Sequence, residues 1–584
     1  MMILGLATMG ESSAALLENG RIVAAAEEER FTRHKHEGCF PIRSTHYCLK
    51  EAGISMREVD HVGIYWQPWR VKTRVKGVLA SAVKNPPAFL GKLRRSFREF
   101  SPAGAGQEPD HEGSWLELFQ ARKILEKLFG KFKAPIRYLD HHHCHVASAF
   151  FVSPFDEALI LSFDGAGEEV STMIAVGEGN RFRPLRTMPW PNSLGHFYSA
   201  MTGFLGFQML DGEYKLMGLA SYGKPEYLDY IRKNVLITDQ PGSYQLDSRL
   251  LDYHEALEGR FSKGITETFG GPRQGSEELV TQRHQAIASS VQAAFEEVVL
   301  DLARWGYQAG GEKTKICITG GCGLNCTANG KILSDSPFHG MYVPPAPHDA
   351  GCSMGAGLLL YHCVLGFPRT YYMDHAYWGP SFSDHDVFQA LVNRGVHLEP
   401  VSRESDLLER TASVLAGGGV VGWFQGRMEF GPRALGARSI LADPRDDSIR
   451  EVINQKIKKR ELFRPFAPSV KEESVSEYFE IDQESPFMNV VARVKPGKRG
   501  DIPAVTHVDG TARLQSVSRR ANPRYWELID CFEKKTGVPV LLNTSFNIQE
   551  PIVCTPDEAV DTFLRSQLDA LVIENYFVPR QILK

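Results

Sequence analysis

ALILSFDGAGEEVSTMIAVGEG, residues 158–179, is the stretch that decides the fold. An apolar run that suits a buried strand leads into a glycine turn, and a second apolar run ends at Gly177-Glu178-Gly179. Residues 3–25 have the same order of strand, glycine turn, strand and hairpin, with Asn19-Gly20 as the hairpin turn. Two copies of this unit predict a pair of duplicated α/β lobes. Two unrelated hairpins are the alternative interpretation.

The glycine turns of such a pair suggest a phosphate site. They can face each other across a cleft and offer backbone N–H groups to phosphates. Residues 315–319 form a further predicted buried strand that runs into Gly320 and Gly321, with Asn325 close behind. A strand that ends in a glycine pair is a candidate nucleotide-binding loop.

The composition is that of a multidomain globular protein. At roughly 150 residues per domain, 584 residues suggest two to four domains. A net charge of −4 argues against nucleic acid or a membrane surface as a partner. No apolar run is long enough to span a bilayer, and the first residues lack the basic lead of a signal peptide. The 10 cysteines form no CxxC pair, so we expect reduced thiols and a cytoplasmic protein.

A histidine cluster marks a candidate metal site. His141, His142, His143 and His145 follow Asp140 and precede an apolar run that suits a helix. If the helix begins near His141, then His141 and His145 lie on one face and can offer two nitrogen ligands to a divalent metal. A solvated or structural cluster is the alternative. Asp349 precedes a predicted helix at residues 352–360, which it could cap.

A cluster of cations marks a candidate anion site in the C-terminal half. Residues 426–439 place three arginines among glycines, and residues 456–464 add further basic side chains. Arginine forks bind phosphate or carboxylate, and glycine lets the backbone come close. The apolar run that ends at Ser545 and Asn547 supplies short polar side chains that can complete the pocket.

Two segments fall outside these motifs. Residues 66–108 interleave basic and aromatic side chains and are predicted as an insertion, either a solvated helical excursion or a lid or anionic-partner surface. A domain boundary is predicted at residues 366–404, which contain glycines and prolines.

Taken together, the motifs resemble the ATP-dependent O-carbamoyltransferases of the NodU/CmcH/TobZ type. The resemblance spans nearly all of the chain except residues 66–108. Its main motifs are AEEERFTR at residues 26–33, the histidines of residues 141–145, GPRALG at 431–436 and FRPFAPS at 463–469. It implies an α/β protein in which residues 1–365 form a TsaD-like domain with a duplicated actin/Hsp70-like (ASKHA) fold. Residues 366–404 would connect it to a YrdC-like α/β domain at residues 405–584.

The resemblance also implies a reaction in two stages. The C-terminal domain would form carbamoyl adenylate from carbamoyl phosphate and ATP with Mg(II), and the N-terminal domain would pass the carbamoyl group to a hydroxyl of a small metabolite. The implied residues for ATP and carbamoyl phosphate are Arg433, Lys458, Arg464, Arg513, Ser545 and Asn547. The implied metal ligands are His141, His145, Asp164 and Asp349, for Fe(II) or alternatively Mn(II) or another divalent ion. The implied residues for the adenylate are Lys35, Gly165, Gly167, Lys215, Gly320, Gly321 and Asn325.

One position departs from the family pattern. The family commonly has His-Asp ahead of the first hairpin, and that histidine is the proposed base for the acceptor hydroxyl, whereas this chain has Gly10-Glu11. Glu11 with a pKa raised by burial, His36, or the acceptor itself are the candidate replacements. Diversion of carbamoyl adenylate to another nucleophile or to water, and a nucleotide sensor without turnover, are therefore alternative functions. The sequence does not identify the acceptor, and the resemblance is compatible with a homodimer.

Overall fold

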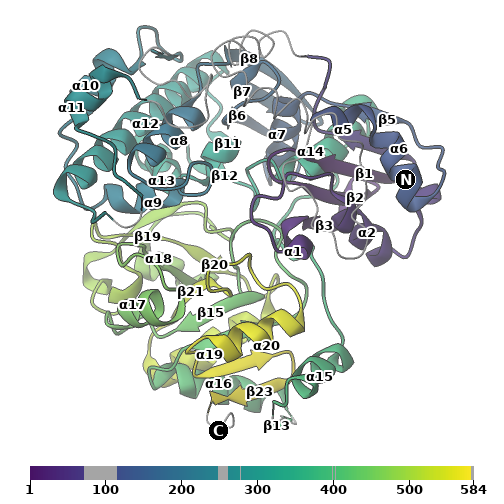
Figure 1. Cartoon of the computed structure of the whole chain (residues 1–584), viewed down its shortest axis with the longest axis vertical. Helices are drawn as coiled ribbons and strands as arrows, with labels where there is room; N and C mark the ends of the chain where they lie inside the picture. Colours follow the sequence, from purple (N-terminus) through teal and green to yellow (C-terminus); the bar gives the residue numbers. More distant parts are fainter. Residues whose placement is uncertain (71–114, 248–260, 276–277, 397–398, 401–402, 581–584) are drawn as a thin grey trace. The chain divides into compact units, whose positions relative to one another are not determined.

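The computed structural model describes residues 1–70, 115–247, 261–275, 278–396, 399–400 and 403–580 (Figure 1). These residues form two compact units. The first unit contains Met1–Glu28 and His36–Tyr372, and the second contains Glu29–Lys35 and Met373–Lys584. The expected insertion at residues 66–108 lies outside the described residues except for residues 66–70. Within the described residues, no helix combines the length and apolar character needed to cross a bilayer.

The first unit contains two five-stranded sheets with the same strand order. One sheet has the order β3-β2-β1-β4-β5 and the other has the order β8-β7-β6-β11-β12. In each sheet the first three strands pair antiparallel and the last two are added in parallel. The strands are β1 (Met2–Ala7), β2 (Ser13–Glu18), β3 (Arg21–Glu27), β4 (His61–Ile64), β5 (Ile136–Tyr138), β6 (Glu157–Phe163), β7 (Val170–Glu178), β8 (Arg181–Pro189), β11 (Lys315–Thr319) and β12 (Gly340–Tyr342). The common order confirms the predicted duplication of the lobes.

The first hairpin shows why the sequence folds in this way. Asn19 and Gly20 have φ angles of 50° and 80°, the left-handed conformation that a two-residue turn between antiparallel strands requires. The strands on either side of this turn are almost wholly buried.

Two helices of the first unit lie close to both sheets. Helix α7 (His141–Phe150) packs against β6, and helix α14 (Gly351–Leu359) packs against β1 and α7. A methyl group on Gly355 would lie 2.0 Å from the Cys144 carbonyl oxygen, and one on Gly5 would lie 1.9 Å from the Ser353 carbonyl oxygen. Glycine therefore allows α14 to touch α7 and β1 backbone to backbone.

The remaining elements of the first unit are shorter helices, one long helix and a small hairpin. The long helix is α12 (Gln282–Ala309), which buries one apolar face. The others are α2 (Ile42–Glu51), α5 (Trp115–Phe119), α6 (Ala121–Phe129), α8 (Leu194–Phe204), α9 (Glu213–Ala220), α10 (Leu228–Asn234), β9 (Leu236–Ile237), β10 (Gln245–Leu246), α11 (Lys263–Phe269) and α13 (Cys326–Asp335).

The second unit is built on an eight-stranded mixed sheet with the order β13-β23-β22-β14-β15-β21-β16-β20. Its strands are β13 (Glu399–Pro400), β14 (Val421–Phe424), β15 (Arg438–Ala442), β16 (Ala467–Lys471), β20 (Gln515–Val517), β21 (Val540–Ser545), β22 (Ala570–Ile573) and β23 (Tyr576–Pro579). A separate sheet holds β17 (Phe479–Glu480), β18 (Val491–Val494) and β19 (Thr511–Arg513). The helices are α1 (Glu29–Thr32), α15 (Asp384–Asn393), α16 (Glu404–Ala416), α17 (Ile449–Glu451), α18 (Val475–Tyr478), α19 (Pro523–Thr536) and α20 (Pro556–Arg565).

The division between the units differs from the expected domain boundaries. The expected connecting segment, residues 366–404, contains helix α15, whose Val387 and Leu391 are fully buried in the core of the second unit. The second unit therefore begins at Met373, because the apolar face of α15 needs that core to cover it. Residues 29–35 also belong to the second unit, although they lie within the sequence of the expected N-terminal domain.

Candidate functional site

Four predicted metal ligands meet in the first unit. His141 and His145 lie one turn apart on α7, Asp164 follows β6, and Asp349 precedes α14. Their ligand atoms all lie within 4.8 Å of one another. The two imidazole Nε2 atoms are each 3.1 Å from Asp164 Oδ2. His145 Nε2 is 3.4 Å and His141 Nε2 is 3.8 Å from Asp349 Oδ1.

These distances fit ligands that share one ion. Atoms bound at about 2.1 Å to one metal lie about 3.0–3.4 Å from each other at octahedral or tetrahedral angles. The donor set of two imidazoles and two carboxylates suits a borderline divalent ion such as Fe(II), Mn(II) or Zn(II). His141, His145 and Cys352 form a second candidate set that shares both imidazoles. The structure thus contains a candidate metal site, and its geometry does not select one metal.

The electrostatics of the two carboxylates favour a cation. Burial raises the pKa of Asp164, but hydrogen bonds with His141 and His145 hold it well below its ordinary value. Burial and the charge of Asp164 raise the pKa of Asp349. Two acids that repel each other in a buried pocket are stabilised by a bound cation.

The alternative role of Asp349 as a helix cap is wrong. The residue that caps α14 is Ala350, and no side chain makes the capping hydrogen bond. Asp349 faces His145 instead, and the Tyr65 hydroxyl lies 3.4 Å from its Oδ2. A methyl group on Gly10 would lie 2.6 Å from the same oxygen, so the position that lacks the family histidine faces a metal ligand.

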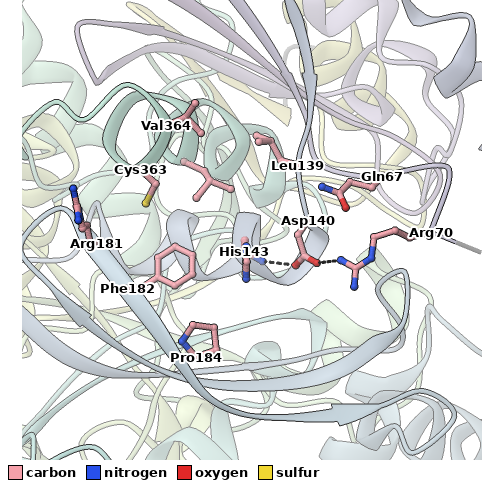
Figure 2. Close-up of a pocket in the computed structure, with 11 residues that line it drawn as sticks. Gln67, Arg70, Leu139, Asp140, His143, Arg181, Phe182, Pro184, Cys363 and Val364 are labelled. Atoms are coloured by element: carbon pink, nitrogen blue, oxygen red, sulfur yellow. Dashed lines mark hydrogen bonds and ion pairs between the residues drawn. The ribbon is translucent and has the colours of Figure 1, made fainter.

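The other histidines of the cluster point elsewhere. His142 Nδ1 lies 2.8 Å from Ser162 Oγ, and burial together with the charges of His141 and His145 lowers the pKa of His142 to about 3. His143 lines a cavity of about 710 Å³, shown in Figure 2, which also includes Arg70 and Asp140. None of the four metal-ligand candidates lines this cavity.

The prediction that burial raises the pKa of Glu11 is wrong. Burial does act in that direction, but the neighbouring His348 and His36 outweigh it and lower the pKa of Glu11. His348 Nε2 and His36 Nδ1 each lie 3.0 Å from the carboxylate. Because two imidazoles stabilise its charged form, Glu11 is a poorer proton acceptor than expected. His36 Nε2 also lies 3.0 Å from Asp211 Oδ1.

Several residues predicted to bind the adenylate already have partners within the protein. The amides of Gly165 and Gly321 donate to Asp164 Oδ1 at 2.7 and 3.1 Å. The Asn325 side chain caps helix α13 and pairs with Gln292 at 3.0 Å.

The other three predicted adenylate residues have different local roles. Gly320 has a φ of 86°, and a methyl group there would lie 2.1 Å from the Phe163 carbonyl oxygen, so the position requires glycine. The amide of Gly167 donates to the Val170 carbonyl oxygen at 2.8 Å. The Lys215 ammonium lies 5.7 Å from the centre of the Phe207 ring. Gly167 lies beside His141, and Gly320 lies beside Phe163, which precedes the ligand Asp164. Contact of the three residues with a nucleotide stays a prediction.

The predicted anion site of the second unit is centred on Lys458. This side chain is 1% exposed, and its Nζ is 2.6 Å from Asn547 Oδ1 and 3.1 Å from Ser545 Oγ. Among the described residues, no carboxylate lies within ion-pair distance of this Nζ. Burial lowers the pKa of Lys458 well below its ordinary value, and the charges of Arg460 and Arg464 lower it further. Such a cluster favours binding of an anion.

The remaining predicted anion ligands are partly exposed. Arg464 lies 3.7 Å from Glu461, and Arg433 belongs to the loop that follows Gly431. Arg513 ends strand β19. Lys35 lies in the second unit, and its positive charge also lowers the pKa of Lys458. Lys35 therefore belongs to the same unit as the anion site, and its contact with the adenylate stays a prediction.

Sequence reasoning missed some neighbours of both sites. Tyr65 and Trp66 place their rings 5.3 and 5.2 Å from that of His141 and thereby fix its orientation. Nothing in the local sequence links these aromatic residues to α7. Arg30 and Arg33 contact the loops of the anion site, and the basic positions of the motif at residues 26–33 are the signal that could have revealed them.

Comparison with known proteins identifies the family. The model described as "Carbamoyltransferase N-terminus" matches residues 2–358, and that described as "Carbamoyltransferase C-terminus" matches residues 412–580. An uncharacterized protein of Synechocystis is 41% identical, over 98% of this chain and 95% of that protein. The nodulation protein NolNO of Sinorhizobium fredii is 40% identical, over 98% of this chain and 79% of that protein. The 3'-hydroxymethylcephem-O-carbamoyltransferase of Streptomyces clavuligerus is 29% identical, over 70% of this chain and 73% of that enzyme.

Solved structures add little. HypF of T. kodakarensis aligns with 62% of this chain and 48% of its own, at 13% identity and a TM-score of 0.31, which is too low to support a conclusion. The family matches and the identities over nearly the full length are decisive. This chain belongs to the carbamoyltransferase family, in both its N-terminal and its C-terminal part.

Proposed function

We propose that this protein is an ATP-dependent carbamoyltransferase that forms carbamoyl adenylate and transfers the carbamoyl group to a hydroxyl of a small metabolite. Family membership supports the transferase activity, and the name of the Streptomyces clavuligerus relative supports a hydroxyl-bearing acceptor. The observation that carries the proposal is the buried Lys458, which lies beside Ser545 and Asn547 and has no ion-pair partner among the described residues. A buried cation of this kind is stabilised by an anionic substrate.

The first stage is assigned to the second unit. Water displaces inorganic phosphate from carbamoyl phosphate, and the resulting carbamate attacks the α-phosphorus of ATP and releases pyrophosphate. Every reactant and leaving group is anionic, so Arg433, Lys458 and Arg464 would hold and neutralise them. Ser545 and Asn547 orient the Lys458 ammonium through their oxygens.

The second stage is assigned to the first unit. The acceptor hydroxyl attacks the carbonyl of carbamoyl adenylate, the bond to AMP breaks, and the hydroxyl proton leaves. His141, His145, Asp164 and Asp349 would hold the metal, which supplies Lewis-acid polarisation and a fixed position for the substrate. The proposed proton acceptor is the hydrogen-bonded set of Glu11, His36 and Asp211, in which each ring nitrogen of His36 lies 3.0 Å from a carboxylate that can take up a proton.

A second candidate function follows from Gly10 and Glu11. Gly10 supplies no imidazole beside Asp349, and the lowered pKa makes Glu11 a weak base. An enzyme that lacks a base for alcohols can transfer the carbamoyl group from carbamoyl adenylate, with release of AMP, to an amine, which is nucleophilic without prior deprotonation, or to water.

The experiment measures the two stages separately. Incubation with ATP and carbamoyl phosphate is expected to release pyrophosphate, and Arg433→Ala is expected to abolish this release. His145→Ala is expected to release pyrophosphate but to yield no carbamoylated product. Equal loss of both activities in His145→Ala would contradict the assignment of the stages to separate sites. A wild-type protein that releases no pyrophosphate would overturn the proposal, and release without product across a panel of alcohols would favour the second candidate.

A further inference from the structure

Residues 29–35, here called the strap, are a short excursion of the chain from the first unit into the second. Glu28 is fixed in the first unit, because its backbone N–H donates to the Ser12 carbonyl and its carboxylate accepts hydrogen bonds from Ser44. His36 is fixed there through Glu11. The intervening strap contains helix α1 and belongs to the second unit.

One arginine of the strap is attached to the loop that carries Arg433. Arg30 is 4% exposed, and its Nη2 donates to the Gly431 carbonyl oxygen at 2.9 Å. Its Nη1 donates to Glu29 Oε1 at 2.6 Å, so both ends of the guanidinium are fixed. Gly431 is followed by Pro432 and then Arg433, which leaves little backbone freedom between the two arginines.

A second arginine of the strap is attached to the loop that follows the Lys458 partners. Arg33 donates to the carbonyl oxygens of Pro551 and Ile552 at 2.6 and 2.9 Å and lies 3.2 Å from Glu558. The same loop contains Glu550, whose carbonyl oxygen accepts a hydrogen bond from Asn547 Nδ2 at 2.5 Å.

An apolar contact joins the two attachment points. Phe31, which stands between the two arginines, packs against a small cluster formed by Met428, Ile552 and Cys554. Met428 precedes the Arg433 loop, and Ile552 and Cys554 follow the Asn547 loop. The strap therefore contacts both loops of the anion site through three side chains, those of Arg30, Phe31 and Arg33.

We infer that the strap is part of the anion site. Arg30 and Arg33 are positioning residues, which hold the Arg433 loop and the Asn547 loop at the distance from each other that anion binding requires. The inference rests on the proposed function for the identity of the anion, carbamoyl phosphate. The two loops come from distant parts of the sequence, and a guanidinium is rigid enough to fix a carbonyl at each of its forks. If the loops shift apart, fewer charged hydrogen bonds reach the bound anion, so its affinity falls.

The test compares Arg33→Met, Arg33→Lys and Arg30→Met in the full-length protein. Calorimetric titration measures the affinity for carbamoyl phosphate, and pyrophosphate release measures KM and kcat of the first stage. Arg33→Met is expected to weaken binding and to raise KM about tenfold or more, with a much smaller change in kcat. Arg33→Lys keeps one donor and is expected to recover part of the affinity. Arg57→Met, which removes an exposed arginine of the first unit, is the matched control.

The outcomes separate this inference from the proposed function. Unchanged affinity and KM in both Met variants would overturn the inference. This holds even if the unfolding temperatures of the variants fall, because a strap with a purely structural role would lower stability and leave binding unchanged. A wild-type protein that binds carbamoyl phosphate but releases no pyrophosphate would overturn the proposed function, while the affinities would still test the strap. A wild-type protein that binds no carbamoyl phosphate would overturn both.

Discussion

Lys458 is a buried lysine in surroundings that disfavour its charged form. Burial lowers its pKa well below the ordinary value, so folding disfavours its charged form. A lysine with a depressed pKa contributes stability that is fully present above its unfolded pKa, near 10.4, and is lost as the pH falls through the folded pKa. Folding without a bound anion therefore opposes protonation of Lys458 at neutral pH.

The lowered pKa of Lys458 leads to a prediction about how stability depends on pH. Lys458→Met is expected to raise the free energy of unfolding more at pH 7 than at pH 10, by up to about 1.4 kcal/mol for each unit of the pKa shift that falls between these two pH values. Denaturant unfolding at the two pH values measures the difference. Lys456→Met removes an exposed lysine two positions away and is expected to show no such dependence. An equal effect of Lys458→Met at both pH values would contradict the lowered pKa.

The residue scale is also where sequence reasoning failed for Glu11. The sequence suggests that burial raises its pKa, and burial does act in that direction. The opposing charge comes from His348, which is distant in the sequence and reaches Glu11 only through the fold. In contrast, His141 and His145 were predictable, because their spacing on one helix is a local property.

At the scale of elements, helix α7 depends on its first residue. Asp140 caps the helix by accepting a hydrogen bond from the His143 backbone N–H at 3.1 Å, and its other oxygen accepts one from Arg70 at 2.6 Å (Figure 2). An acidic N-cap satisfies an otherwise unpaired N–H group and favours the helix dipole. The position of both imidazole ligands therefore depends on this cap.

Substitution of Asp140 separates its two roles. Asp140→Ala removes both interactions and is expected to lower the free energy of unfolding by about 1–2 kcal/mol. Asp140→Asn keeps an oxygen for the cap, so its cost is expected to be clearly smaller. Denaturant unfolding of metal-free protein measures both values. Equal losses would show that the partly exposed ion pair with Arg70, and not the cap, stabilises the helix.

The sequence predicted the elements well where their signals are local. Residues 158–163 and 171–176 were expected as strands and are parts of β6 and β7, and the small-residue run before residue 360 is α14. Strand β14 begins at Val421, shortly after the glycines of residues 417–419. Gly417 is the C-cap of α16 and Gly418 has a φ of 85°, so the glycines end a helix before the strand starts.

At the scale of the whole molecule, the chain passes between the two units three times. It crosses after Glu28, after Lys35 and after Tyr372. The first two crossings could not be predicted, because the strap resembles a surface helix of the N-terminal part and its arginine anchors depend on carbonyl groups far along the chain. The duplication of the first unit could be predicted, because the same order of strand, glycine turn and strand occurs twice in the sequence.

The strap leads to a prediction about cleavage. If a protease site is inserted between Tyr372 and Met373 and cut, the two pieces are expected to remain together in gel filtration, since Arg30, Phe31 and Arg33 of the N-terminal piece are bound in the second unit. The double variant Arg30→Met/Arg33→Met is expected to separate more readily. Identical elution of cut wild type and cut variant would show that the strap does not hold the pieces together.

The backbone contact between α7 and α14 affects which ions the candidate metal site can bind. The carbonyl of Cys144 lies so close to Gly355 that no methyl group fits between the helices, and these helices carry or directly follow three of the four candidate ligands. Because the two helix backbones already touch, the ligands that they carry cannot be drawn closer together by a small ion. Calcium, which needs six to eight oxygen ligands, should be disfavoured by the two imidazole donors. The helix contact would thus set a lower limit on ion size, in addition to the chemical preference of the donors.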